Sequence, residues 1–166
     1  MCGDPSYLSP EQVKTMGHNH TVDFWSLGVL IYEMLTGVLP FGDADTPETE
    51  LYKNISGHTK DVDCFEKAAN ADAISEDAKD LVASLLYPES DQRIGSGAKG
   101  CEDIKQHPWL KDTHWKELTQ GRLPAPHADI CSVKTQQNIS RDLEKEFVTD
   151  AEAMASEDLP EELEMF

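Results

Sequence analysis

The stretch VDFWSLGVLIYEMLTGVLPF, residues 22–41, decides the fold of this chain. Gly37 is a typical helix terminator, so we expect one helix from about Thr21 to Thr36. Apolar side chains are distributed around most of the circumference of this helix, and a helix of that kind is normally buried in the middle of a domain. They are Val22, Phe24, Trp25, Leu27, Val29, Leu30, Ile31, Met34 and Leu35.

Shorter helices are expected on both sides of this central one. Ser9 followed by Pro10 is typical of a helix start and Gly17 of a helix end, which predicts a helix over 9–16. Similar start and stop signals predict helices over about 46–55, from 75 to just before Pro88, and over 101–107. Because no segment alternates apolar and polar residues as a strand does, we expect a mainly α fold.

The character of the chain changes after residues 124–126, which read PAP. Acidic residues dominate from 142 to 166, and Lys145 is the only basic residue there. That charge density favours an extended or partly disordered tail over a packed unit. We therefore divide the chain into a helical domain over 1–126 and an acidic tail over 127–166.

Composition excludes several classes of function. The 166 residues carry a formal net charge of −18, which argues against binding nucleic acid through phosphate contacts. The longest apolar run, around 27–35, is too short to span a bilayer, and no signal peptide precedes it, so we expect a cytoplasmic protein without membrane contact. Cysteine and histidine are scattered without metal-ligand spacing, so neither a disulfide framework nor a metal site is expected.

Four short motifs follow one another in a fixed order. They are Ser9-Pro10-Glu11, Asp23-Phe24-Trp25 with Gly28, Leu39-Pro40-Phe41, and Arg93 within DQRIG. Together they resemble the large, C-terminal lobe of eukaryotic serine/threonine protein kinases, and most closely the cyclic-nucleotide-dependent kinases of the AGC group. The resemblance covers about 2–126, and the terminal LEMF, 163–166, is similar to the hydrophobic motif that ends AGC kinases.

The resemblance implies structural roles for the motif residues. It pairs Glu11 with Arg93 in a buried ion pair, and removing one partner of such a pair strands the other charge. It places Asp23 in the first turn of the central helix, where a carboxylate favours the helix dipole and, in complete kinases, accepts hydrogen bonds from the catalytic loop. Trp25 and Gly28 belong to the same helix and are expected to be structural.

The resemblance also implies a site for a substrate peptide. Pro5 and Leu8 match positions that line the pocket for the residue after the phosphoacceptor. Glu33 matches a carboxylate that pairs with a substrate arginine, with Tyr7 nearby. An acidic residue inside an apolar helix needs a reason, and this role supplies one. The alternative is that Glu33 lies on an exposed stripe with Glu50 and contributes only solubility.

The motifs that perform phosphoryl transfer do not occur in this sequence. His-Arg-Asp, Asp-Phe-Gly and Val-Ala-Ile-Lys are all missing, and these supply the catalytic aspartate, the magnesium ligand and the phosphate-binding lysine. Residues 95–100 match GxGxxG but follow a helix rather than a strand, so we expect a surface loop there. Asp4 stands where serine/threonine kinases carry a threonine, and a carboxylate there would weaken the catalytic arrangement of a parent enzyme.

Three hypotheses for function remain open. The first is a fragment of a serine/threonine kinase that, when complete, would use ATP and magnesium to phosphorylate serine or threonine in basic peptides. Such a fragment would hold no cofactor of its own, would need the missing small lobe and catalytic loop as partners, and would be inactive alone. The alternative is a free-standing, non-catalytic, pseudokinase-like module that binds basic peptides or a kinase partner. The third is a degenerate product that aggregates.

Overall fold

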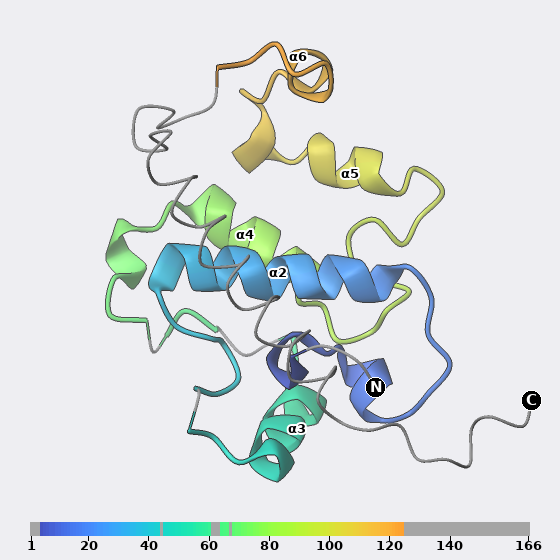
Figure 1. Ribbon diagram of the computed structural model, residues 1–166, viewed down its shortest axis with the longest axis vertical. Helices are drawn as coiled ribbons and strands as arrows, with labels where there is room; N and C mark the ends of the chain where they lie inside the picture. Colours follow the sequence, from blue (N-terminus) through green and yellow to red (C-terminus); the bar gives the residue numbers. More distant parts are fainter. Residues whose placement is uncertain (1–3, 44, 61–63, 67, 125–166) are drawn as a thin grey trace, which may run out of the picture. The chain divides into compact units, whose positions relative to one another are not determined.

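The protein is described by a computed structural model that covers residues 4–43, 45–60, 64–66 and 68–124. The chain divides into two units, 1–114 and 115–166, and each is described by itself. The predicted acidic tail over 127–166, together with its LEMF end, lies outside the described residues. Within the described ranges the secondary structure is helical, and none of it is β-strand, so the predicted mainly α class is confirmed (Figure 1).

The first unit contains five α-helices and three 3-10 turns within its described residues. The second unit contributes α6, Trp115–Thr119. The elements of the first unit, in chain order, are η1 (Pro5–Tyr7), α1 (Pro10–Val13), α2 (Thr21–Thr36), α3 (Glu48–Gly57), η2 (Ala71–Ala73), α4 (Glu76–Leu85), α5 (Cys101–Lys105) and η3 (Pro108–Leu110).

Helix α2 is the central element of the first unit, as the sequence predicts, and its bounds are confirmed. It ends at Gly37, whose left-handed φ of 79° lets its N–H donate to the Glu33 carbonyl at 2.7 Å. Helix α4 lies alongside α2 (Figure 1). The two helices approach closely at Gly28, where an added Cβ would lie 2.9 Å from the Leu85 Cβ and 2.9 Å from a Leu86 methyl. Glycine at this position therefore sets the spacing of the core.

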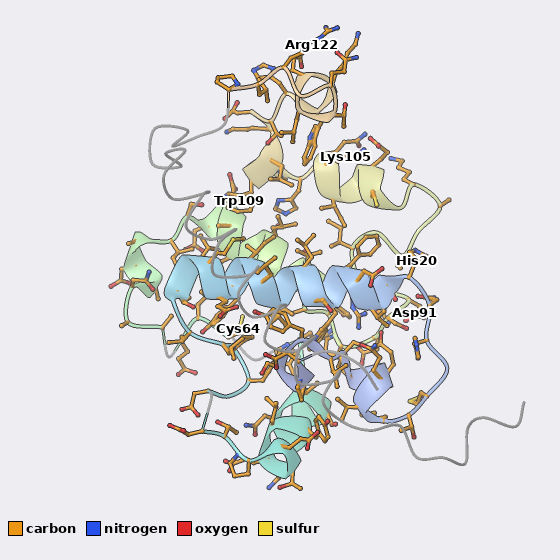
Figure 2. All side chains as sticks on the ribbon, in the orientation of Figure 1. His20, Cys64, Asp91, Lys105, Trp109 and Arg122 are labelled. Atoms are coloured by element: carbon orange, nitrogen blue, oxygen red, sulfur yellow. The ribbon has the colours of Figure 1, made fainter. Side chains whose placement is uncertain are left out.

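The core of the first unit is built on α2 and α4 and extends to α3 and to the segment around Phe65. Tyr32 reaches that segment, because its hydroxyl donates to the Cys64 carbonyl at 2.9 Å. Figure 2 labels Cys64 among the side chains of the first unit. The buried apolar side chains of the core are Phe24, Trp25, Val29, Ile31, Tyr32, Phe41, Leu51, Ile55, Phe65, Ala68, Ile74, Ala78, Leu81, Val82, Leu85, Leu86 and Ile104.

One stripe of α2 is exposed, so the expectation that the helix is buried on nearly all sides is wrong there. Leu30 is 42% exposed and Met34 is 68% exposed. The two residues are four positions apart and lie one turn from each other on the same face. Val38, just beyond the helix end, is also exposed. The described part of the chain covers the other faces of α2 but leaves this apolar stripe open.

The first predicted helix, over 9–16, is shorter than expected, because α1 ends at Val13. Thr15 adopts a left-handed φ of 53°. The N–H of Met16 donates to the Glu11 carbonyl at 2.9 Å, and the N–H of Thr15 donates to the Gln12 carbonyl at 3.0 Å. This pair of bonds is the Schellman ending of a helix, and it uses Thr15 where the sequence analysis expected Gly17 to act.

Helix boundaries elsewhere follow the capping residues. Ser75 caps α4 by accepting the N–H of Ala78 at 3.3 Å, as its sequence position predicts. The last helix of the first unit ends at Lys105 rather than 107, because the His107 side chain caps η3 by accepting the Trp109 N–H at 3.3 Å. The third helix is displaced by two residues and runs from Glu48 to Gly57.

Candidate functional site: a clamped peptide segment on helix α2

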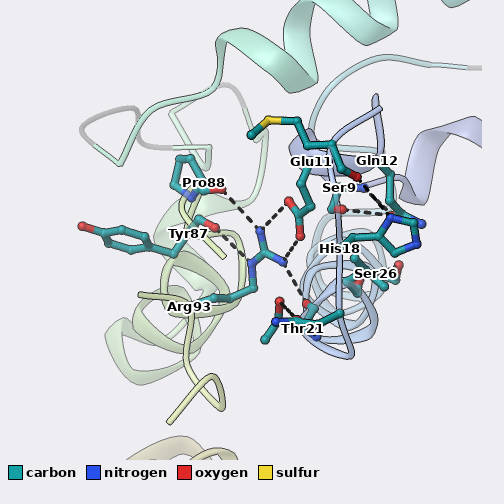
Figure 3. A network of polar contacts seen from close by, with 12 residues as sticks. Ser9, Glu11, Gln12, His18, Thr21, Ser26, Tyr87, Pro88 and Arg93 are labelled. Carbon is teal, nitrogen blue, oxygen red and sulfur yellow. Dashed lines mark hydrogen bonds and ion pairs between the residues drawn. The ribbon is translucent and has the colours of Figure 1, made fainter. Parts of the chain in front are cut away.

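Residues 4–13 lie across α2 and are held to the first unit by two groups of side-chain contacts. The first is the Glu11–Arg93 pair, which Figure 3 shows at the centre of a polar network. Arg93 Nη1 lies 2.8 Å from Glu11 Oε1, and Nη2 lies 3.1 Å from Oε2, so the contact is bidentate. Arg93 is 1% exposed and Glu11 is 8% exposed. This is the buried ion pair that the sequence resemblance implies.

All three nitrogens of the Arg93 guanidinium have hydrogen-bond partners. Its Nη1 also donates to the Thr21 carbonyl at 2.8 Å, its Nε to the Tyr87 carbonyl at 3.0 Å, and its Nη2 to the Pro88 carbonyl at 3.4 Å (Figure 3). The guanidinium lies 5.2 Å from the centre of the Trp25 ring, within cation–π range. One arginine thus joins α1, the start of α2 and the loop after α4.

The electrostatics of Glu11 follow from that pairing. Burial by itself raises the pKa of the Glu11 carboxyl, but the hydrogen bonds and the charge of Arg93 act more strongly in the opposite direction. The pKa of Glu11 therefore lies below its ordinary value of 4.5. The carboxylate stays ionised at neutral pH, which a buried acid does only when it is paired.

Trp25 is completely buried between these elements. Its ring stacks on Phe41 with centroids 5.4 Å apart and planes 10° apart, and it makes an edge contact with His58 at 5.9 Å. Its Nε1 is the one buried side-chain nitrogen or oxygen without a hydrogen-bond partner among the described residues. The structural role that the sequence resemblance implies for Trp25 fits this burial.

The second clamp joins η1 to the middle of α2. The Tyr7 hydroxyl donates a hydrogen bond to the Glu33 carboxylate. About two turns before Glu33 on α2, Ser26 Oγ donates to the Tyr7 carbonyl at 2.9 Å. The sequence resemblance places Glu33 and Tyr7 near each other. It gives no role to Ser26, which lies one position after Trp25 and carries no distinguishing signal.

The Tyr7–Glu33 contact shifts the titration of the phenol. Its hydrogen bond to Glu33 is the main cause that raises the pKa of Tyr7 above 10.0, with burial and the negative charges of Glu33 and Asp4 adding to it. Glu33 is partly buried, whereas Glu50 on α3 is exposed. The two carboxylates therefore do not share one exposed stripe, as the solubility alternative requires.

The remaining predicted site residues differ in accessibility. Pro5 is half-buried in η1, and Leu8 is only 8% exposed because it packs inward at the end of that turn. The exposed Asp4 carboxylate caps η1 by accepting the Ser6 N–H at 2.9 Å. Asp23 is exposed in the first turn of α2, and the described part of the chain places no donor on its carboxylate.

Among the described residues, no three histidine, cysteine or acidic side chains come close enough together to hold a metal ion. Over the same ranges, none of the helices is long and apolar enough to cross a membrane. At this site the Glu33 carboxylate accepts a hydrogen bond from Tyr7 beside the 3-10 turn η1.

The α1 glutamate, Glu11, is thus paired with the buried Arg93 beside the long central helix α2 of a helical unit. Residues 1–110 match the protein kinase domain, so the chain belongs to the protein kinase family. It is 39% identical over 126 residues to the cAMP-dependent protein kinase catalytic subunit 3 of Drosophila melanogaster. It is 37% identical over 126 residues to the cAMP-dependent protein kinase catalytic subunit PRKX of Mus musculus. It is also 39% identical over 125 residues to the serine/threonine-protein kinase gad8 of Schizosaccharomyces pombe.

These matches cover most of this chain but a small part of each relative. They include 75–76% of the chain and only 20–33% of the relatives' own length. The family and the helical large-lobe character predicted from the motifs are thus confirmed.

Proposed function

We propose that this chain is the substrate-contacting part of a cytoplasmic serine/threonine kinase similar to the cAMP-dependent kinases. In its complete form the parent would transfer the γ-phosphate of ATP, with magnesium, to serine or threonine in basic peptides. The chain would supply the surface that holds the peptide, with Glu33 reading an arginine and with Pro5, Tyr7 and Leu8 positioning the residues around the acceptor.

The observation that carries the proposal is the hydrogen bond from Tyr7 to Glu33. It fixes the carboxylate beside residues 5–8 while leaving one of its two oxygens able to accept from a ligand, because Tyr7 donates to Oε2 alone. An arginine guanidinium binds a carboxylate with strong, directional hydrogen bonds. The net charge of −18 adds a long-range attraction for a basic peptide.

The open stripe of α2 supports the fragment reading over the free-standing one. Leu30 and Met34 expose apolar surface on the face that begins at the unpartnered carboxylate of Asp23. A contiguous exposed apolar surface typically marks a contact with another segment or chain. The missing catalytic loop and small lobe are the partners we propose for this face.

ATP and magnesium do not fit the residues present. The described ranges hold no metal-ligating cluster, and the loop at 95–100 leads from turns into a helix of only five residues. Gly95 in that loop packs directly against the Phe24 ring, where an added Cβ would lie 2.6 Å from a ring carbon. Both cofactors are therefore assigned to the parent, and phosphorylation by this chain alone is not proposed.

The test is binding of a fluorescent peptide that carries two arginines shortly before a serine, followed by anisotropy at low salt. We expect binding by the wild-type chain that falls about tenfold or more in Glu33→Gln, because one charge-assisted contact is worth about 1.5–3 kcal/mol. The exposed Glu50→Gln is the matched control and should bind like the wild type. Equal loss in both variants, or equal binding of a peptide with glutamine in place of arginine, would refute the assignment.

The alternative, a free-standing non-catalytic module that binds basic peptides or a kinase partner, uses the same surface and is separated by a different measurement. Sequencing the transcript through its 5′ end shows whether the reading frame continues upstream. A frame that continues into Asp-Phe-Gly and His-Arg-Asp supports the fragment. A start codon at Met1 preceded by stops would support the free-standing module.

A further inference from the structure

His58 lies at the junction of α3, α2 and the segment around Phe41. It follows α3 directly and donates its backbone N–H to the Ile55 carbonyl. Its ring makes edge contacts with Phe41, at 5.2 Å between centroids, and with Trp25 on α2, at 5.9 Å. A single half-buried imidazole therefore joins the end of α3 to α2 and to the segment around Phe41.

The charged side chains around His58 cancel one another, so their net charge does not stabilise a protonated ring. The ring lines two pockets of about 330 and 620 Å³, and the charged groups in their walls balance as two lysines and two glutamates. Arg93 lies across the Trp25 ring, but its charge is matched by Glu11. The charged and titratable side chains that line the pockets are Lys53, Lys60, Glu66, Glu89, Tyr32, Tyr87 and Cys64.

We propose that His58 is a pH-sensitive latch whose neutral ring holds the end of α3 against α2 and whose protonation releases it. A protonated ring would be a half-buried cation, and it would gain solvation by moving into the adjoining pockets. Because α3 packs against η1 and α1, release of α3 also loosens residues 5–13. This device concerns the stability of the fold and is independent of what those residues bind.

The direction of titration agrees with this geometry. Burial lowers the pKa of His58 below 6.5, and the hydrogen bond to the Leu86 backbone offsets only part of that effect. The unfolded chain therefore takes up a proton at a higher pH than the folded chain does. The stabilising contribution is complete above pH 6.5 and is lost as pH falls from there through the lower pKa of the folded state.

The test compares urea midpoints of the full chain at neutral pH and at pH about 5.5, where an ordinary histidine is protonated. We expect the wild-type midpoint to fall on acidification, and the fall to be clearly smaller in His58→Gln, which stays neutral. His18→Gln, at an exposed position, should retain the full wild-type fall. The buried His107 is unchanged in all three proteins, so any contribution from it cancels.

A second measurement keeps the proposal testable if His58→Gln does not fold. The ring proton resonances of His58 in the wild-type chain give its pKa directly, and hydrogen exchange of the α3 amides reports release of the helix. We expect a His58 pKa below the ordinary value of 6.5, with loss of α3 protection over the same pH range. A pKa at or above 6.5, or α3 protection unchanged through the titration, would overturn the latch.

Discussion

Replacing Glu11 by glutamine tests the central claim about what holds the lobe together. The wild-type pair makes two charge-assisted hydrogen bonds of 2.8 and 3.1 Å at a site where Arg93 is 1% exposed. Glutamine has nearly the same shape, so the change removes the charge and leaves Arg93 stranded. Breaking a buried pair in this way costs about 3–5 kcal/mol. A domain of this size has about 5–15 kcal/mol in total, so the change should remove a large share of the stability.

Equilibrium unfolding in urea, followed by far-ultraviolet circular dichroism, measures the free energy of unfolding for this variant. The chain supplies a matched control in Glu102→Gln, because Glu102 forms an exposed pair with Lys105 at 2.6 Å on α5. Exposed pairs of this kind contribute about 0.2–1 kcal/mol. The contrast between the two variants isolates burial, since both remove one carboxylate from an ion pair.

A double-mutant cycle with Arg93→Met separates the stranded charge from the lost hydrogen bonds. Arg93→Met alone orphans the carbonyls of Thr21, Tyr87 and Pro88, so it is costly in its own right. In the double variant no charge is stranded, and its cost should fall short of the sum by about 0.5–3 kcal/mol, as for contacting residues in general. A Glu11→Gln cost below about 1 kcal/mol, the range of a surface pair, would refute the reasoning.

Three further perturbations of the first unit should have measurable effects on its stability. Gly28→Ala should destabilise the chain by about 1–3 kcal/mol through overpacking, because its Cβ would lie 2.9 Å from Leu85; an increase in urea midpoint would contradict it. Acidification below 4.5, the ordinary pKa of Glu11, should remove stability in the wild type as pH falls through the lower folded value, and Glu11→Gln should lack this component. Tyr7→Phe should cost about 0.5–1.5 kcal/mol in urea unfolding, and absorbance titration should lose one phenol that ionises above 10.0.

The sequence predicts the central helix to the residue, because Thr21–Thr36 has strong apolar patterning and Gly37 as its terminator. It does not predict the end of α1, where tertiary contacts of Glu11 favour a Schellman ending at Thr15 over the glycine two positions later. Nor does it predict which face of α2 stays open. Periodicity counts apolar residues around a helix, whereas exposure of Leu30 and Met34 depends on which other segments are present.

Some contacts of the candidate site are likewise predictable from the sequence, and others are not. The Glu11–Arg93 contact is predictable through the family resemblance although its partners are 82 residues apart. The contributions of Ser26 and of the Tyr87 and Pro88 carbonyls are not, because a serine in a helix or a backbone acceptor in a loop has no distinctive sequence context. His58 is missed for a related reason, since its role comes from three rings brought together by tertiary packing.

Residues 4–13 contain no strand pairing and only one short helical turn of each kind, so their position depends on side-chain clamps. One clamp holds Tyr7 through Glu33 and Ser26, and the other holds Glu11 through Arg93. If the segment binds a peptide as proposed, disrupting one clamp should have a different effect from disrupting the other. Loss of the Glu33 charge removes a direct contact and leaves the fold intact, whereas loss of the Glu11 charge removes the framework that keeps Tyr7 and Glu33 together. Stability and peptide affinity should therefore fall together in Glu11→Gln and separately in Glu33→Gln.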